Sequence, residues 1–190
     1  QKIIGRGASS TIYSAFDTNK NCDVVFKVIS NAKFKDAYNK EVTSLSILKH
    51  PHIIQMYSKS SSSNDSSRNN LIVFEKMDCD LFTYLSEHTI NVDRALYIFT
   101  CICKAVQHCH SQKIAHLDIK PENILLSNNG TTVKLCDFGG SAQWTEENIL
   151  VHETSSTAEY CAPEVYNSSG FAGDKADMWS LGILLHILLT

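Results

Sequence analysis

The sequence predicts an α+β fold in which a strand-rich first lobe is followed by a mainly helical second lobe. The first third of the chain contains short runs rich in β-branched residues, which favour strands. After residue 78 the apolar residues recur at helical spacing. Because the strands come first and the helices second, we expect two lobes with a cleft between them.

The first lobe is expected to hold several strands and one helix. Phe34, Tyr38 and Val42 begin an apolar series at helical spacing, so we expect the helix over Phe34–Leu48. The expected strands are Lys2–Ile4, Thr11–Ala15, Asp23–Ile29, Ile53–Tyr57 and Leu71–Phe74. The segment Ser58–Asn70 is nearly all polar and cannot bury apolar area, so we expect a disordered or mobile loop there. A phosphorylated regulatory loop is the alternative interpretation.

The second lobe is expected to combine helices with one hairpin. Asn128-Asn129-Gly130 is a hairpin signal between two short apolar runs. A polar segment follows over residues 139–157. The expected elements are helices at Asp80–Glu87, Val92–Ser111 and from about Asp174, with strands at Ile124–Leu126 and Thr132–Leu135.

Charge and composition narrow the function classes. The net charge of the 190 residues is −3, so no basic field indicates nucleic acid or a membrane surface as a partner. We expect no signal peptide, and the apolar stretch Met178–Leu189 is short for a membrane span, which favours a buried helix. The seven cysteines form no CxxC pair, so we expect reduced thiols and an intracellular location, in the cytoplasm or nucleus.

A glycine-containing turn lies between the first two expected strands. Gly5 and Gly7 in Gly5-Arg6-Gly7-Ala8-Ser9-Ser10 would let backbone amides approach phosphate groups closely. A tight hairpin turn explains the same residues. The strand–turn–strand context argues against a dinucleotide-binding fold, which needs a strand followed by a helix.

Lys27 stands inside the apolar strand Val24–Ile29. A buried lysine needs a partner, because an unpaired buried charge is costly. Glu41, on the next expected helix, is the natural candidate. The alternative is a surface lysine on an edge strand.

The most informative stretch runs from His116 to Asn123 and is followed by Asp137-Phe138-Gly139. It concentrates Asp118, Lys120, Asn123 and Asp137 around one short hairpin. Phosphoryl transfer needs such a set: an acceptor for a hydroxyl proton, a cation for the moving charge, and hard oxygen ligands for Mg²⁺. Two polar turns flanking a hairpin would not explain why all of these residue types occur together.

With these motifs, the chain resembles the catalytic domain of eukaryotic protein kinases over nearly its whole length. Ala162-Pro163-Glu164 and Asp177–Gly182 extend the resemblance. Lys120-Pro121-Glu122-Asn123 is similar to serine/threonine kinases, and the glycine turn with His116-Leu117-Asp118 resembles the calcium/calmodulin-dependent group. The resemblance implies a bilobal fold. A small antiparallel lobe with one helix and the hinge would cover residues 1–77, and a larger helical lobe, incomplete at its C-terminus, residues 78–190.

The resemblance also implies roles for individual residues. Asp118 would orient the acceptor hydroxyl and take its proton, and Lys120 would neutralise the γ-phosphate of ATP. Asn123 and Asp137 would bind Mg²⁺. Lys27 would hold the α- and β-phosphates. The residues implied to contact or support the nucleotide are Ile4, Gly5, Gly7, Ser10, Ile12, Val25, Lys27, Glu41, Phe74, Glu75, Met77, Asp80, Leu125 and Asp137.

Within this set, Ile12, Val25 and Leu125 would sandwich the adenine. Phe74 would act as gatekeeper, and Asp80 would reach the ribose. The backbone of residues 75–77 would bind the adenine edge. A stacked spine of Leu45, Met56, His116 and Phe138, and a substrate pocket lined by Thr157, complete the expected site.

The implied function is transfer of the γ-phosphate of ATP to serine or threonine hydroxyls of a protein substrate. A pseudokinase that keeps the fold without the transfer is the main alternative, and a small-molecule phosphotransferase is the other. Leu117 stands where most family members carry an arginine that binds an activation-loop phosphate. We therefore expect activity that does not depend on phosphorylation of Thr154 or Ser155.

Overall fold

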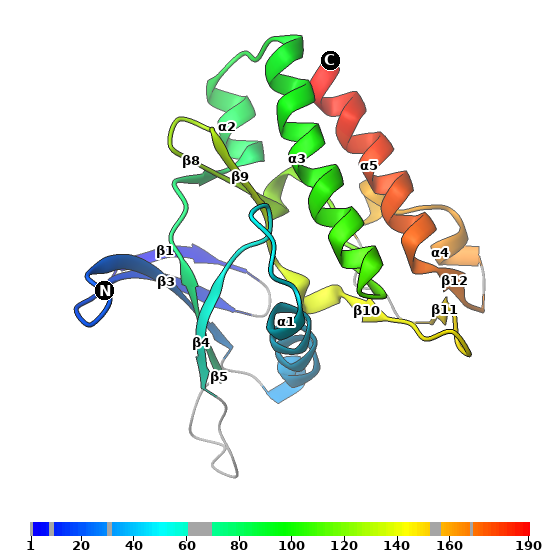
Figure 1. Cartoon of the computed structure of the whole chain (residues 1–190), viewed down its shortest axis with the longest axis horizontal. Helices are drawn as coiled ribbons and strands as arrows, with labels where there is room; N and C mark the ends of the chain where they lie inside the picture. The colour runs from blue at the N-terminus through cyan, green and yellow to red at the C-terminus, as the bar shows by residue number, and fades with distance from the viewer. Residues whose placement is uncertain (1, 8–9, 30–31, 61–69, 153–156, 168) are drawn as a thin grey trace.

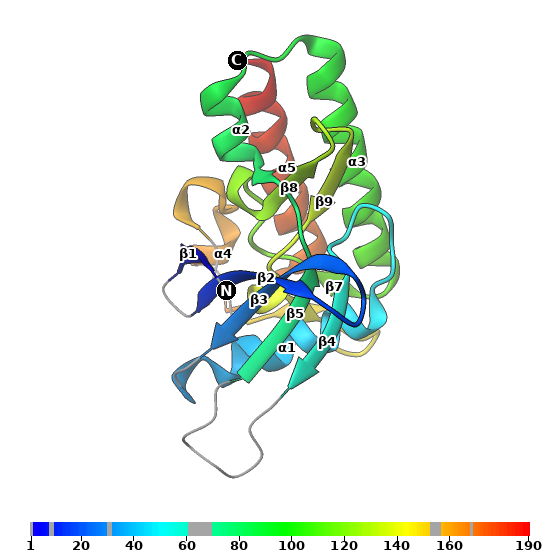
Figure 2. The ribbon, with the colours of Figure 1, turned by 90° about the vertical axis from the view of Figure 1, so that its left-hand side faces the viewer.

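A five-stranded antiparallel sheet forms the first lobe of the chain (Figures 1 and 2). In the computed structural model, residues 2–7, 10–29, 32–60, 70–152, 157–167 and 169–190 are described. The sheet has the order β1-β2-β3-β5-β4. Its strands are β1 (Lys2–Arg6), β2 (Thr11–Asp17), β3 (Cys22–Ile29), β4 (Met56–Ser60) and β5 (Asn70–Glu75). The expected α+β fold with an antiparallel first lobe is confirmed.

The fourth strand differs from the sequence prediction. We expected a strand over Ile53–Tyr57, but Ile53 and Ile54 are buried in the core before β4 begins, and Ile53 forms a bridge with Leu135. The strand then continues to Ser60, because its backbone pairs with β5 even where its side chains are polar. Part of the expected loop is thus sheet, and residues 61–69 lie outside the described part of the chain.

One helix, α1 (Lys35–Ile47), packs against this sheet after a short 3₁₀ turn, η1 (Ala32–Phe34). Tyr38, Val42 and Leu45 form its buried apolar stripe, as the helical spacing predicted. Glu41 lies on the same buried side. A carboxylate there needs a cation, which the sheet provides.

The second lobe contains helices α2 (Leu81–Glu87), α3 (Val92–Ser111), α4 (Glu164–Asn167) and α5 (Gly173–Leu189). The helix α3 has the predicted bounds, and Asn91 caps it by accepting a hydrogen bond from the backbone of Arg94. α5 lies beside α3. Leu181, Leu184 and Leu188 of α5 are buried, whereas other apolar residues of α5 are exposed. None of the helices in the described part of the chain combines the length and apolar character needed to cross a membrane.

Short strands and 3₁₀ turns connect the helices. The hairpin of β8 and β9 turns at Asn128, Asn129 and Gly130, which have φ values of 53°, 54° and 79°, and these residue types tolerate positive φ. The two-residue strands β6, β7, β10, β11 and β12 were not predicted. The bounds are β6 (Cys79–Asp80), β7 (Ile114–Ala115), η2 (Pro121–Asn123), β8 (Ile124–Ser127), β9 (Thr132–Leu135), η3 (Phe138–Gly140), β10 (Ala142–Gln143), β11 (Leu150–Val151), η4 (Ala158–Tyr160) and β12 (Phe171–Ala172).

Candidate active site

Lys27 joins the sheet to α1 and to the second lobe. It lies on β3, whose neighbours are β2 and β5, so the edge-strand alternative is wrong. Its Nζ is 2.7 Å from Glu41 Oε2 and 2.8 Å from Asp137 Oδ1. The side chains of Lys27 and Glu41 are only 11% and 2% exposed. One buried cation is therefore shared between two carboxylates from different parts of the chain.

The charges of this triad depend on one another. Burial by itself would lower the pKa of Lys27, but the two carboxylates outweigh burial and raise that pKa above its ordinary value. Burial raises the pKa of Glu41, and Lys27 opposes that shift. Burial would also raise the pKa of Asp137, but Lys27 lowers it to below its ordinary value. Lys27 and Asp137 are therefore both ionised at neutral pH.

Asp118 is the centre of a second cluster. Its Oδ1 accepts hydrogen bonds from the backbone N–H and the hydroxyl of Thr157, at 3.1 and 2.7 Å. Its Oδ2 accepts from Asn123 Nδ2 at 2.8 Å and lies 3.0 Å from Lys120 Nζ. Lys120 also donates to the Thr157 hydroxyl at 2.6 Å. A hydroxyl group thus fits between this carboxylate and this ammonium group.

Backbone hydrogen bonds connect the two clusters. The N–H of Cys136 donates to the carbonyl of Asn123 at 2.9 Å, and the carbonyl of Cys136 lies 2.9 Å from His116 Nε2. These contacts fix the residue before Asp137 against the loop that bears Asp118. The predicted catalytic residues and the predicted metal ligands are therefore neighbours in space.

Asp177 on α5 supports the segment His116–Asn123, which bears the predicted catalytic residues and is called the catalytic loop below. Asp177 is fully buried and accepts hydrogen bonds from the backbone N–H groups of His116 and Leu117, at 2.9 and 2.8 Å. Its Oδ2 also lies 2.8 Å from His110 Nε2. Asp177 belongs to a motif of the family resemblance but had no predicted role. His110 was not predicted at all, since no local pattern relates residues 67 positions apart.

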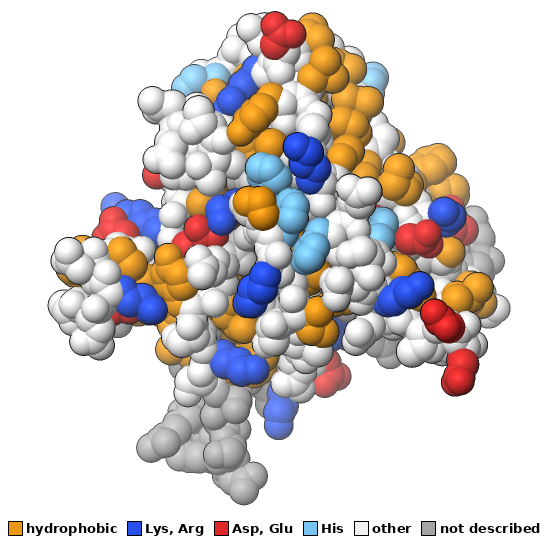
Figure 3. All heavy atoms as spheres, viewed as in Figure 1, with side chains coloured by type: hydrophobic (Ala, Val, Ile, Leu, Met, Phe, Trp, Pro, Cys, Tyr) orange, Lys and Arg blue, Asp and Glu red, His pale blue; other side chains and the backbone are white. Residues whose placement is uncertain are grey.

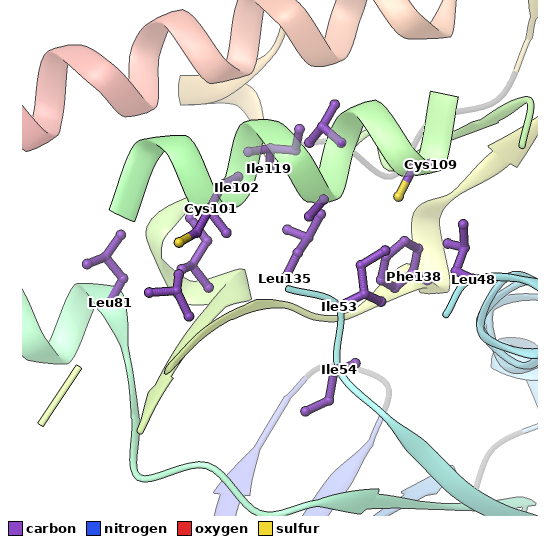
Figure 4. Packing of buried hydrophobic residues seen from close by; sticks show 14 of the residues in the cluster. Leu48, Ile53, Ile54, Leu81, Cys101, Ile102, Cys109, Ile119, Leu135 and Phe138 are labelled. Carbon is purple, nitrogen blue, oxygen red and sulfur yellow. The ribbon is translucent and has the colours of Figure 1, made fainter. Parts of the chain in front are cut away.

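Phe138 turns inward from the site. Its side chain is fully buried, close to Ile53 and Leu48 (Figure 4). Its ring lies edge-on to His116, with the ring centroids 4.7 Å apart. Leu45 is fully buried in the same core cluster, and Met56 packs against that cluster. All four residues of the expected spine therefore belong to, or adjoin, the central core.

The residues predicted to bind Mg²⁺ offer suitable oxygen atoms. The amide nitrogen of Asn123 donates to the backbone carbonyl and the carboxylate of Asp118, which leaves its Oδ1 as an acceptor. Among the described residues, hydrogen bonds to Asp137 engage Oδ1 only. Asp137 is ionised and its side chain is 47% exposed. An amide oxygen and a carboxylate oxygen are hard ligands, so these two residues fit a Mg²⁺ ion.

The residues predicted to contact a nucleotide come from both lobes. Strand pairing sets Gly5 opposite Ile12, Ile12 opposite Lys27, and Val25 opposite Phe74. In the other lobe, Asp80 pairs with Leu125. Ile4 occupies an irregularity in the β1–β2 pairing and is 52% exposed. Met77 packs against the core between the two lobes.

The glycine turn leaves room beside its backbone. A Cβ at Gly5 would lie 3.7 Å from Ile12, and a Cβ at Gly7 would lie 3.9 Å from Ser10, so packing requires neither glycine. The Gly7 N–H donates to the carbonyl of Ser10 at 2.9 Å. Ala8 and Ser9 lie outside the described residues. Close approach of a phosphate group to these glycines stays a prediction.

Two side chains of the predicted nucleotide set have other partners. Glu75 accepts a hydrogen bond from the backbone of Gln55 and pairs with Lys134, both at 2.7 Å, so its side chain holds strands together. Asp80 caps α2 by accepting hydrogen bonds from the N–H and the hydroxyl of Thr83. A serine, threonine or aspartate directly before a helix is the signal that could have revealed this cap.

Leu117 lies in an apolar cluster behind the catalytic loop. It is 3% exposed and has a φ of 65°, which is unusual for a branched residue. Val151 of β11 and Phe171 of β12 belong to the same cluster, together with Ala115, Ala162 and Ala176. Apolar packing thus joins the catalytic loop to the segment that follows Asp137. Thr154 and Ser155, the candidate phosphorylation sites, lie outside the described residues.

Comparison with known proteins agrees with this geometry. The family model described as the protein kinase domain matches residues 1–190. CBL-interacting protein kinase 2 of Oryza sativa subsp. japonica is 32% identical over 196 residues, covering 100% of this chain and 43% of the relative. CBL-interacting serine/threonine-protein kinase 2 of Arabidopsis thaliana is 32% identical over 196 residues, covering 100% and 42%.

A yeast relative shows a similar degree of likeness. The carbon catabolite-derepressing protein kinase of Saccharomyces cerevisiae is 32% identical over 194 residues, covering 99% of this chain and 30% of the relative. The chain therefore spans less than half the length of these curated relatives.

Proposed function

The chain belongs to the protein kinase family, and we propose that it transfers the γ-phosphate of ATP to serine or threonine hydroxyls of protein substrates. The observation that carries this proposal is the hydroxyl of Thr157, which donates to Asp118 and accepts from Lys120. An acceptor alcohol needs the same two partners, a base for its proton and a cation for the charge that moves onto the phosphate. The names of the curated relatives support serine or threonine as the acceptor.

In this proposal Asp118 orients the acceptor hydroxyl and receives its proton. Asn123 holds the Asp118 carboxylate in place through its amide N–H, at 2.8 Å. Lys120 offsets the negative charge of the transferred group. Because phosphoryl transfer involves little covalent chemistry by the protein, positioning and charge stabilisation account for most of the catalysis.

Lys27 would bind the nucleotide phosphates, while Glu41 keeps its ammonium group in position. Asn123 and Asp137 would hold Mg²⁺, which supplies charge neutralisation to the phosphate oxygens. The seven cysteines carry free thiols, which fits a reducing compartment, so the proposal includes a cytoplasmic or nuclear location.

The test is a phosphotransfer assay with MgATP and a library of serine and threonine peptides. Wild-type protein should phosphorylate a subset of the peptides, and EDTA should stop the reaction. Asp118→Asn should lower turnover at least a hundredfold, roughly the scale of a lost general base. Asp93→Asn is the matched control, because Asp93 is an exposed aspartate in the first turn of α3.

Two outcomes would contradict the proposal. A protein that binds ATP but transfers no phosphate to any peptide would be a pseudokinase. Turnover that survives in Asp118→Asn would mean that the catalytic residue lies elsewhere.

A further inference from the structure

One face of α1 packs along the turn that follows Asp137 (Figure 1). Ala37, Glu41 and Ser44 are spaced four and three residues apart, so they lie on the same face of the helix. At the first position the packing is close, since a Cβ on Gly139 would lie 3.5 Å from the Ala37 Cβ. At the second, Glu41 is connected to the turn through the shared lysine.

At the third position two hydroxyl groups meet. Ser44 Oγ and Ser141 Oγ are 2.8 Å apart, and the two residues are only 6% and 2% exposed. The Ser141 hydroxyl also lies 2.7 Å from the carbonyl oxygen of Phe138, to which it must donate its only proton. The Ser44 hydroxyl is therefore the donor to Ser141. This gives a directed chain from α1, through Ser141, to the carbonyl of Phe138.

The end of this chain lies next to a critical backbone angle. The carbonyl of Phe138 belongs to the peptide that follows Phe138, one residue after Asp137. Asp137 has a φ of 62°, in the left-handed region that non-glycine residues rarely adopt. Such a conformation persists only when surrounding contacts hold it. The serine pair supplies one of these contacts.

One side of the buried pair borders a cavity. A cavity of about 520 Å³ lies beside it, lined by residues of α1 and by residues 141–143, 148 and 150–152. Ser44 and Ser141 are both part of its wall. The hydrogen bond between Ser44 and Ser141 therefore connects α1 to this segment at the edge of the cavity.

We propose that Ser44 and Ser141 are positioning residues that hold the Asp137–Gly139 turn against α1 in the geometry needed for transfer. They do so through the Phe138 carbonyl and without touching substrate or nucleotide. The inference rests on the proposed function for its effect on rate, but the contact itself can be measured without any activity.

The experiment combines turnover with hydrogen exchange of the ATP-free protein. Ser44→Ala and Ser141→Ala are compared with Ser44→Thr, which keeps the hydroxyl, and with the double alanine variant. Ser46→Ala is the matched control, since the Ser46 hydroxyl donates only within α1, to the Val42 carbonyl at 2.7 Å. Exchange is followed in peptides that cover residues 138–143.

Ser44→Ala is expected to lower kcat about fivefold, which corresponds to one net hydrogen bond of about 1 kcal/mol. Ser141→Ala, which also removes the hydrogen bond to the Phe138 carbonyl, is expected to lower kcat at least as much. The double variant is expected to lose no more than Ser141→Ala, because that variant already breaks the contact with Ser44. In the alanine variants, hydrogen exchange of the backbone amides of residues 138–143 is expected to become severalfold faster. Ser44→Thr and Ser46→Ala are expected to match wild type in both measurements.

The proposal is overturned if exchange in Ser44→Ala equals that of wild type, or if the kcat losses of the two alanine variants add fully. It is also overturned if Ser44→Thr is as impaired as Ser44→Ala. If the wild-type protein transfers no phosphate, the proposed function fails by itself, and the exchange measurement alone still decides whether the serine pair holds the turn.

Discussion

Replacing Lys27 by methionine should damage stability as well as activity. The substitution removes the cation between Glu41 and Asp137 and leaves the Glu41 carboxylate, 2% exposed, without its partner. Breaking a buried ion pair in this way costs about 3–5 kcal/mol. In a domain of this size each kcal/mol shifts Tm by about 2–4 °C, so we expect Lys27→Met to melt roughly 6–20 °C below wild type at about pH 7.5.

The pH dependence identifies the cause. Burial already raises the pKa of Glu41, and loss of Lys27 removes the opposing effect, so this pKa rises further. A carboxyl whose pKa is higher in the folded state loses stability as pH rises through that pKa. The Tm deficit of Lys27→Met should therefore be small near pH 5 and grow toward pH 8. Differential scanning fluorimetry across this range measures it, beside an ADP-release assay that should show no turnover.

Two further variants sharpen the test. Lys27→Met/Glu41→Leu removes the unpaired charge, so it should recover most of the lost Tm while remaining inactive. Lys76→Met is the matched control, because Lys76 pairs with Asp23 at a similar distance, 2.8 Å, but on the surface, where such a pair contributes about 0–1 kcal/mol. A Lys27→Met protein that melts like Lys76→Met, or whose deficit does not vary with pH, would refute the reasoning.

Three more predictions concern other parts of the structure. Removal of any phosphate from residues 153–156 should leave turnover nearly unchanged, because Leu117 holds the neighbouring segment by apolar packing; a tenfold fall, about 1.4 kcal/mol of barrier, would contradict this. Burial raises the pKa of the Cys136 thiol, so a cleft-directed electrophile should label it slowly, and saturating ATP should slow it further; equal rates with and without ATP would count against the expected site. Burial, followed by repulsion from neighbouring cations, lowers the pKa of His50. The stability that depends on neutral His50 should therefore be fully present above about pH 6.5 and decline below it. In thermal melts His50→Phe should reduce that decline, and an unchanged decline would exclude the effect.

The histidine prediction has a visible structural basis. The ring of His50 stacks on that of His108, with centroids 5.2 Å apart, and lies 5.5 Å from that of His52. Figure 3 shows histidine side chains gathered on one face of the molecule. Protonation would place like charges side by side there, which opposes the folded state.

Long periodic segments could be predicted well from the sequence, and short ones could not. The helix α3 has the predicted bounds because its apolar pattern persists over 20 residues. The two-residue strands β10, β11 and β12 are too short to show any period. Tertiary packing also moved β4, since burial of Ile53 against the second lobe outweighed its strand propensity.

The contacts of the site also differ in how well the sequence predicted them. Spacing and residue type along the chain were enough to associate Lys27 with Glu41, and Asp118 with Lys120. The contact between Lys120 and Thr157, and that between Ser44 and Ser141, join residues 37 and 97 positions apart. No local pattern encodes such pairs. The family resemblance placed Thr157 at the substrate pocket, but the pairing of Ser44 with Ser141 is seen only in the folded chain.

Two buried carboxylates on different helices support the site from opposite sides. Glu41 extends from α1 toward the lysine of the sheet, and Asp177 at the start of α5 holds the backbone of the catalytic loop. The positions of Lys27 and of the loop that bears Asp118 therefore depend on two different helices, so the spacing between the two predicted functional residues depends on how α1 and α5 are placed.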